Sequence, residues 1–340
     1  MKSKLINIFK YVIFLLIGVS LLYYSFKGVP FDDFIESVKN ANYFYISLNV
    51  LFGLFAFISR AIRWKIAIEP LGYNANTYNT FYALMIGYLT NMAFPRLGEV
   101  TRCSSLYKTD KIPFNKLLGT VIIERALDLL ILFSLMIVVF FLNINLFGKF
   151  ISDIIIGGLT EKLSNILGSS FAAWAVLGFI IILPLLIFIV FRDKIMKLKI
   201  AKKIIDILAG VAEGVKTIYK MKKIWWFIFH TFIIWLNYAI LTYVVFLALP
   251  QTENLTIVDG LFILIIGGVG MSIPAPGGVG SYHYFVSTAL MIFGVSKETG
   301  LVYATISHEA QTLLVIVLGV VSLIIVGLKN KKQKHELDTK

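Results

Sequence analysis

Two long apolar stretches of this chain are interrupted by proline and glycine at corresponding places in its two halves. The first runs from Phe81 to Phe94 and is followed by Pro95-Arg96-Leu97-Gly98-Glu99. The second runs from Leu261 to Ile273 and is followed by Pro274-Ala275-Pro276-Gly277-Gly278-Val279-Gly280. A break at membrane depth leaves backbone N–H and C=O groups that lipid cannot satisfy, so it survives only inside protein or beside a polar cavity. Paired breaks of this kind point to the binding site of a transporter.

The composition places the whole chain in a membrane. Hydrophobic residues make up 58% of the 340 positions and charged residues only 15%, whereas a soluble domain carries about 25% charged residues. Several runs reach the ~20 apolar residues that a spanning helix needs. We expect the first of them to be an uncleaved signal anchor, because no small-residue cleavage site follows it. The expected spans are Tyr11–Phe26, Tyr43–Ser59, Leu117–Leu142, Phe171–Phe191, Trp225–Leu249 and Gly300–Leu328.

The net charge of +13 is concentrated in particular loops. Ten Lys and Arg residues lie between Arg192 and Lys223, five Lys follow Leu328, and Pro250–Thr256 has none. By the positive-inside rule the first two segments are cytoplasmic and the third is external. This distribution favours a membrane topology signal over a nucleic-acid surface. Additional attraction of the basic loop to anionic headgroups is the alternative.

The distribution of Lys and Arg agrees with the positive-inside rule only if both interrupted segments are hairpins. If Tyr78–Phe94 were a simple crossing, the loop with ten basic residues would be external, against the positive-inside rule. A hairpin that returns from Pro95 to about Tyr107 removes the contradiction. A second hairpin, entering at Ile257 and returning through Tyr282–Gly294, keeps the basic tail inside. Both termini are then cytoplasmic, and we expect a multi-pass protein of the bacterial cytoplasmic membrane.

The sequence therefore predicts an all-α, polytopic transmembrane bundle with two re-entrant-type hairpins arranged as an inverted repeat. We expect a single integral membrane domain over residues 1–340. Its parts are a signal-anchor helix and loop (1–42), a first repeat (43–142), a connecting helix and basic cytoplasmic loop (143–224), a second repeat (225–328) and a basic cytoplasmic tail (329–340). The alternative is that proline and glycine merely kink ordinary spans, since both are frequent in membrane helices.

Charged residues cluster beside the first break. Each charge at the bilayer centre costs about 2.5–3.5 kcal/mol on translocon scales, so these residues need partners. Glu124 and Asp128 share one helix face, and Arg125 can reach Asp128 at i+3. The cluster is either a structural network or a site where arginines bind a lipid phosphate bidentately. Its members are Arg96, Glu99, Arg102, Glu124, Arg125 and Asp128.

The second half offers polar groups around its own break. His283 follows the glycine apex, and His308 and Glu309 lie in the last span, so a proton-linked role is a hypothesis beside plain hydrogen bonding. Backbone N–H groups at Gly277, Gly278 and Gly280 can bind an anion. We expect Gly278→Ala to abolish function by blocking positive φ, and Gly300→Ala to be mild. Arg60, Arg63, Trp64 and Lys65 are interpreted as interfacial anchors at the end of the second span.

No pattern of an enzyme or cofactor site is found. The single cysteine, Cys103, excludes an intramolecular disulfide, and the four histidines, His230, His283, His308 and His335, have no zinc-ligand spacing. Neither a phosphate-binding glycine loop nor a nucleophile elbow is present. We therefore predict no metal, no cofactor, no nucleic-acid partner and no enzymatic activity.

Taken together, several motifs resemble a known family. They are Arg60-x-x-Arg63-Trp64, Asn91, Pro95-Arg96-Leu97-Gly98-Glu99-x-x-Arg102, Glu124-Arg125-x-x-Asp128 and Pro274-x-Pro276-Gly277-Gly278-Val279-Gly280. In this order they are similar to the signature of the lysylphosphatidylglycerol synthase transmembrane region, also called the flippase-like or UPF0104 family. The resemblance covers about Tyr43 to Leu328. Many members carry Glu near Tyr282-His283 and Arg at the place of His308, so this chain departs from the pattern there.

The resemblance implies a protein that binds and translocates an anionic or phosphate-linked lipid, or a lipid-linked glycan. It implies no synthase activity, because the soluble domain of the multiple peptide resistance factors is not found up to Lys340. Implied partners are membrane lipids, and further copies of the chain or envelope-synthesis enzymes. The alternatives are a membrane-embedded lipid-phosphate transferase and a non-transporting member of an envelope-synthesis complex.

The topology can be tested by cysteine labelling after Cys103 is replaced. Single cysteines at Asn254 and Lys297 should react with an impermeant thiol reagent added outside intact cells, because both positions are external in the charge-based topology. Cysteines at Asp110 and Lys216 should react only after permeabilisation. Labelling of position 297 exclusively from the cytoplasmic side would contradict the second hairpin.

Overall fold

A computed structural model describes residues 2–142, 144, 157–172, 174–176, 178–179 and 221–338. The chain divides into two compact units, one of Met1–Met136 with Ile218–Lys340 and the other of Ile137–Thr217. The described residues form helices and no strands, which confirms the predicted all-α membrane class. In the second unit the described element is α8 (Gly158–Leu167).

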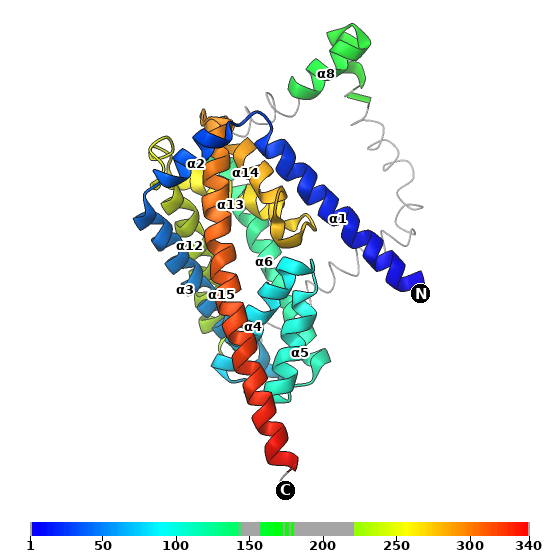
Figure 1. The fold of residues 1–340 in the computed structure, drawn as a ribbon, viewed down its shortest axis with the longest axis vertical. Helices are drawn as coiled ribbons and strands as arrows, with labels where there is room; N and C mark the ends of the chain where they lie inside the picture. Colours follow the sequence, from blue (N-terminus) through cyan, green and yellow to red (C-terminus); the bar gives the residue numbers. More distant parts are fainter. Residues whose placement is uncertain are drawn as a thin grey trace. The chain divides into compact units, whose positions relative to one another are not determined.

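The first unit contains ten α-helices among the described residues, one of which, α6, continues into the second unit (Figure 1). They are α1 (Lys2–Phe26), α2 (Phe31–Lys39), α3 (Tyr43–Ile68), α4 (Thr77–Ala93), α5 (Gly98–Asp110), α6 (Phe114–Leu142), α12 (Ile224–Phe246), α13 (Ile257–Ser272), α14 (Ser281–Leu290) and α15 (Lys297–Asp338). Three short 3₁₀ turns join them, η1 (Glu69–Leu71), η3 (Pro276–Gly278) and η4 (Met291–Phe293).

Four of the described helices are long and apolar enough to cross a membrane, namely Tyr43–Leu71, Phe114–Leu142, Ile224–Phe246 and Lys297–Lys331. The bent pair Val12–Phe26 and Phe31–Lys39, with an angle of 88° between its arms, gives a fifth. These agree with five of the expected spans. Most of the expected span Phe171–Phe191 lies outside the described residues.

The first interrupted segment is a helical hairpin of α4 and α5. Asn76 caps α4 by accepting from the amides of Tyr78 and Asn79. The helix ends where Phe94, the residue before Pro95, turns extended (φ −130°, ψ 100°). At the open end, Asp110 accepts from the backbone amide of Asn76 (2.8 Å) and from the side chain of Asn79 (2.9 Å). The start of α4 and the end of α5 are therefore neighbours, as a hairpin requires.

The second interrupted segment is a hairpin of α13 and α14 with the turn η3 at its apex. Thr256 and Asp259 form a capping box at the start of α13. Ile273, before Pro274, is extended (φ −66°, ψ 131°) and ends the helix. At the open end the rings of Phe262 and Phe293 lie 5.7 Å apart. Both interruptions thus follow the same rule, in which the residue before proline leaves the helical conformation.

The two hairpins enter the bundle from opposite ends, which their contacts with α15 show. At one end, Lys329 donates to the side chain of Asn79 (2.8 Å), beside the open end of the first hairpin. Lys297 begins α15 directly after η4 and Gly294, at the open end of the second hairpin. In Figure 1, α13 and α14 lie near the upper part of α15, and α4 and α5 near its lower part. The structure therefore has the opposed hairpins of an inverted repeat.

The two apices are neighbours in the first unit. A β-carbon at Gly277 would lie 3.7 Å from the Cα atom of Met92, in the last turn of α4. The second apex is also covered by α1, where a β-carbon at Gly280 would overlap the carbonyl oxygen of Gly18. Glycine is thus required at position 280 both by its positive φ of 82° and by the close passage of α1.

Polar side chains join the long helices α3, α12 and α15. The Asn49 side chain donates to the carbonyl of Leu241 (2.9 Å), and Gln311 donates to the side-chain oxygen of Asn49 (2.8 Å). Tyr303 donates its hydroxyl to the carbonyl of Thr242 (2.7 Å). Gly53 leaves room for Gln311, since a β-carbon there would overlap its amide. Small and amide residues of this kind are typical of packed membrane helices.

The expectation that Gly300→Ala is mild is wrong. A β-carbon at Gly300 would lie 2.9 Å from the carbonyl oxygen and 3.1 Å from the Cα of Ser287. Both are backbone atoms of α14, so the two helices would have to separate.

The close crossing of α4 and α5 predicts a strong effect of Gly98→Ala. The new methyl group would overlap the carbonyl oxygen of Gly87 and the side chain of Asn91. We expect a loss of about 1–3 kcal/mol, measured as a lower thermal unfolding midpoint in detergent. The matched control is Gly119→Ala in α6, which has no atom within 4 Å of the new carbon and should be neutral or slightly stabilising. Equal unfolding midpoints for the two variants would contradict the close approach of α4 and α5 at Gly98.

Candidate functional site

The main polar centre of the first unit is a buried charge network of Arg60, Arg63, Arg102, Glu124 and Asp128. Two arginines come from the last third of α3, at i and i+3 on one face. Arg102 comes from α5 and the two acids come from α6 at i and i+4. Arg60, Arg63, Arg102 and Glu124 are buried, and the Asp128 side chain is 14% exposed. Three elements thus meet through charged side chains.

Glu124 lies between two arginines and uses both of its carboxylate oxygens. Its Oε1 accepts from Nη2 of Arg63 (2.9 Å), and its Oε2 accepts from Nη2 of Arg102 (2.9 Å). The Nε atom of Arg60 lies 3.8 Å from Oε1. Glu124 therefore joins α3 to α5 through α6.

Asp128 pairs with the two arginines of α3. Its Oδ1 lies 2.8 Å from Nη1 of Arg63, and its Oδ2 accepts from Nη2 of Arg60. The remaining terminal nitrogen of Arg60 donates to the hydroxyls of Tyr88 (3.1 Å) and Tyr238 (3.2 Å). These tyrosines extend the network to α4 and α12.

The network carries one more positive charge than negative, since three arginines face two carboxylates. Arg102 has the least complete set of partners, because its Nε and Nη1 atoms are buried without a hydrogen-bond partner among the described residues. Its guanidinium stacks on the ring of Trp64 at 4.6 Å, which offsets part of this cost. The site therefore has charge and N–H donors available for an anion.

The structure corrects three interpretations of the sequence. Arg60, Arg63 and Trp64 are not interfacial anchors: α3 continues to Ile68 and all three are buried. Arg125 does not pair with Asp128; its Nε lies 3.5 Å from Oε1 of Glu99, outside the buried network. Arg96 does not join the network either.

Arg96 stands at the tip of the first hairpin. It adopts a positive φ of 67°, is exposed, and forms no ion pair with the described residues. Of the six residues expected to cluster, Arg102, Glu124 and Asp128 are thus brought together, Glu99 and Arg125 form a neighbouring pair, and Arg96 is separate. The pattern Arg60-x-x-Arg63 at i and i+3 is the signal that would have found the missing arginines, had α3 been extended beyond Ser59.

A second centre, which we call the apex cluster, consists of His283, His308 and Glu309. Nδ1 of His308 lies 3.0 Å from Oε1 of Glu309, and Nε2 of His283 lies 3.9 Å from the same oxygen. Nε2 of His308 lies 2.8 Å from the carbonyl oxygen of Gly277. The ring of Tyr282 packs against that of His308 at 5.2 Å. The proton-linked hypothesis from the sequence groups these residues, and the fold brings them to one point beside η3.

The apex glycines have the backbone conformation that was expected, with φ values of 61° at Gly277, 77° at Gly278 and 82° at Gly280. Gly278 does not offer its N–H group to an anion, however. That group donates to the carbonyl of Ala275 (3.0 Å) within the turn. The role of Gly278 is therefore one of backbone shape.

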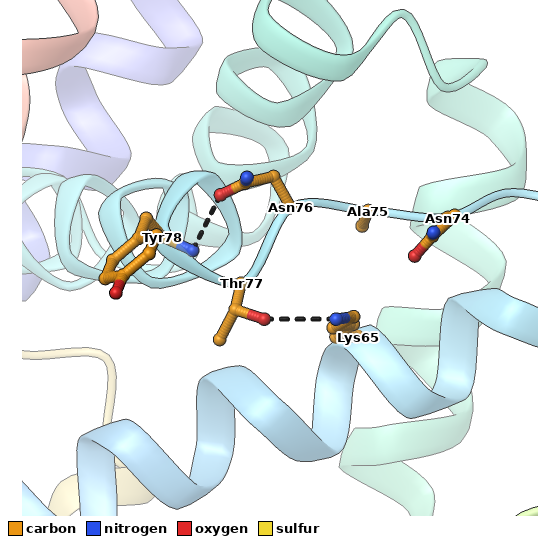
Figure 2. Close-up of a pocket in the computed structure, with 6 residues that line it drawn as sticks. All are labelled: Lys65, Asn74, Ala75, Asn76, Thr77 and Tyr78. Carbon is orange, nitrogen blue, oxygen red and sulfur yellow. Dashed lines mark hydrogen bonds between the residues drawn. The ribbon is translucent and has the colours of Figure 1, made fainter.

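A small hollow of about 270 Å³ lies where α3 approaches the start of α4 (Figure 2). Its lining is Lys65, Asn74, Ala75, Asn76, Thr77 and Tyr78. The polar groups in it are used locally, since Lys65 donates to Thr77 (3.1 Å) and Asn76 caps α4. It contains none of the predicted site residues.

The fold and the buried charges define a class, the polytopic helical membrane proteins with two opposed broken hairpins and a buried charge network. The chain matches the family described as lysylphosphatidylglycerol synthase TM region over residues 9–319, and it belongs to that family. It is similar to the UPF0104 membrane protein MJ1595 of Methanocaldococcus jannaschii, with 22% identity over 97% of this chain and 98% of the relative. The resemblance inferred from the motifs is confirmed.

The charge balance of the network predicts unequal effects of removing its members. Glu124→Gln leaves three arginines facing one acid and should cost about 3–5 kcal/mol of stability. Arg102→Gln leaves two arginines facing two acids and should cost only about 1–2 kcal/mol. The double variant restores the wild-type excess of one charge, so its loss should be smaller than the sum of the single losses.

The measurement is thermal unfolding in detergent, with fluorescence-detected size exclusion to confirm folded protein. Lys223→Gln is the control, because it breaks the more exposed pair with Glu69 (2.9 Å) and should cost under about 1 kcal/mol. Strict additivity of the Arg102 and Glu124 variants would show that the two side chains do not interact.

Proposed function

We propose that this protein binds an anionic or phosphate-linked lipid at the buried charge network and translocates it across the cell membrane. The observation that carries the proposal is the unbalanced positive charge of the network together with the free N–H groups of Arg102. A buried, unpaired charge is costly, and a phosphate oxygen anion would neutralise it. A guanidinium is well suited to this ligand because it binds phosphate through two parallel hydrogen bonds.

The arrangement of the hairpins supports translocation more than static binding. Opposed hairpins whose apices approach each other are the geometry of transporters that expose a central site to one side and then to the other. The first hairpin carries Arg102 and contacts the second at Met92 and Gly277. A shift of one hairpin against the other would therefore alter the surroundings of Arg102.

The residues around the network have distinct roles in this proposal. Arg102 binds the phosphate after its ion pair with Glu124 opens. Arg60 and Arg63 stay with Asp128 and keep α6 in register. Arg96 and the Glu99–Arg125 pair lie at the more exposed side of the hairpin, where they would meet an incoming headgroup. We place both termini in the cytoplasm, as the distribution of basic residues indicates.

The proposal predicts lipid movement by the purified protein in vesicles. Tail-labelled fluorescent phosphatidylglycerol and phosphatidylcholine are compared, and the outer-leaflet label is bleached by dithionite. Wild-type protein should make the inner-leaflet phosphatidylglycerol accessible, and Arg102→Gln should slow this about tenfold or more, because one charge-assisted phosphate contact is lost. The control Lys223→Gln should retain the wild-type rate.

Three results would contradict the proposal. They are equal movement of both lipids, no movement above protein-free vesicles across a panel that includes polyprenyl phosphate, and a wild-type rate in Arg102→Gln. The last would place the lipid site away from the network even if transport is observed.

A further inference from the structure

The apex cluster contains three side chains of the kind that bind transition metals, contributed by two helices. His283 lies on α14, and His308 and Glu309 lie on α15. One ligand atom from each residue can be chosen so that all lie within 4.8 Å of one another. Both imidazoles are buried, whereas the Glu309 side chain is 43% exposed.

The hydrogen bonds of His308 leave a lone pair facing Glu309. The carbonyl oxygen of Gly277 can only accept, so Nε2 of His308, 2.8 Å away, carries the hydrogen. In a neutral ring Nδ1 then has a lone pair, and it lies 3.0 Å from the carboxylate oxygen of Glu309. Two acceptors at this distance require a cation between or beside them. The Thr312 hydroxyl, at 3.5 Å from Nδ1, is at the limit of hydrogen-bonding distance.

His283 indicates which cation fits. Its ring is 3% exposed and its Nδ1 atom has no hydrogen-bond partner among the described residues. Its Nε2 atom lies 3.9 Å from Oε1 of Glu309, too far for a hydrogen bond. A proton shared by His308 and Glu309 would leave Nε2 of His283 without a partner in the cluster. A metal ion bound by Nε2 of His283, Nδ1 of His308 and the Glu309 carboxylate would engage all three residues, and Nδ1 of His283 would then carry the ring hydrogen.

The distances agree with a tetrahedral ion. Zinc binds histidine nitrogen and carboxylate oxygen at about 2.0–2.2 Å, which separates neighbouring ligand atoms by about 3.4 Å. The two separations from Oε1 of Glu309, 3.0 Å to Nδ1 of His308 and 3.9 Å to Nε2 of His283, lie on either side of this value. Small side-chain rotations would therefore be enough to bind an ion.

We propose that His283, His308 and Glu309 form a binding site for a divalent transition metal of the zinc type. The carbonyl of Gly277 holds the His308 ring in the tautomer that leaves Nδ1 free for the ion, a common second partner of metal-bound histidine. Three protein ligands leave the fourth tetrahedral position for water. The bound ion would fix α14 against α15 beside η3. It would reach the site from the side on which the Glu309 carboxylate is exposed.

The test uses full-length protein purified with a tag that contains no histidine and treated with a chelator. Zn²⁺ binding is measured by calorimetry, and Co²⁺ binding by the visible absorption of tetrahedral cobalt. We expect one Zn²⁺ per chain, displacement of Co²⁺ by Zn²⁺, and a rise in the unfolding midpoint on Zn²⁺ addition. His283→Gln, His308→Gln and Glu309→Gln should each weaken Zn²⁺ binding at least tenfold.

The matched control is His230→Gln, because His230 lies on α12 and its nearest ring partners are Trp226 and Phe229. It should bind Zn²⁺ like the wild type. Glu309→Gln, at the half-exposed position, is the variant least expected to disturb folding, and Glu309→Asp should retain part of the affinity. The proposal is overturned if wild-type protein binds neither ion, which would leave a protonated His308, or if His230→Gln loses binding as much as the cluster variants do. A wild-type affinity in folded Glu309→Gln would also overturn it.

Discussion

The fold of the first unit depends on the ion pairs that Glu124 and Asp128 make with arginines of two other elements. Guanidinium groups within a membrane bundle are tolerated only with partners, because lipid offers none. Glu124 bonds both to Arg63 of α3 and to Arg102 of α5 at 2.9 Å, so it fixes the returning arm of the first hairpin to α3 and α6. Any rotation of α6 by one residue would withdraw both carboxylates from these partners.

This network also explains why the broken helix can exist where it does. The returning arm α5 is short and polar, and it stays within the bundle because Arg102 is paired and stacked on Trp64. Trp64 is in turn held by its bond to Thr120 of α6 (2.9 Å). The proline that ends α4 breaks the backbone pattern, and the charged side chains hold the next helix in place.

The sequence predicted those features that are set locally. The residue before a proline leaves the helical conformation, so the ends of α4 and α13 and the two hairpins could be found without a structure. Features that depend on the length or rotation of a helix could not be predicted from the sequence. A hydropathy count ends the second span near Ser59, but α3 runs to Ile68 because its basic residues have buried partners. Arg125 and Asp128 are three residues apart, yet Arg125 pairs with Glu99 of α5 instead.

The contacts within the apex cluster could not be predicted from the sequence either. His283 and His308 are separated by 25 positions, and no spacing rule connects them, because their meeting depends on how α14 returns along α15. The turn η3 contacts both α15 and α4: the carbonyl oxygen of Gly277 accepts from Nε2 of His308 (2.8 Å), and a β-carbon at Gly277 would lie 3.7 Å from the Cα atom of Met92. A β-carbon at position 277 would lie at an ordinary contact distance from Met92, so glycine is favoured there by its positive φ of 61° and not by lack of space. The halves of the first unit are held together along whole helices, α3 against α12 and α4 against α15, so the contact at Gly277 is one part of a wider interface.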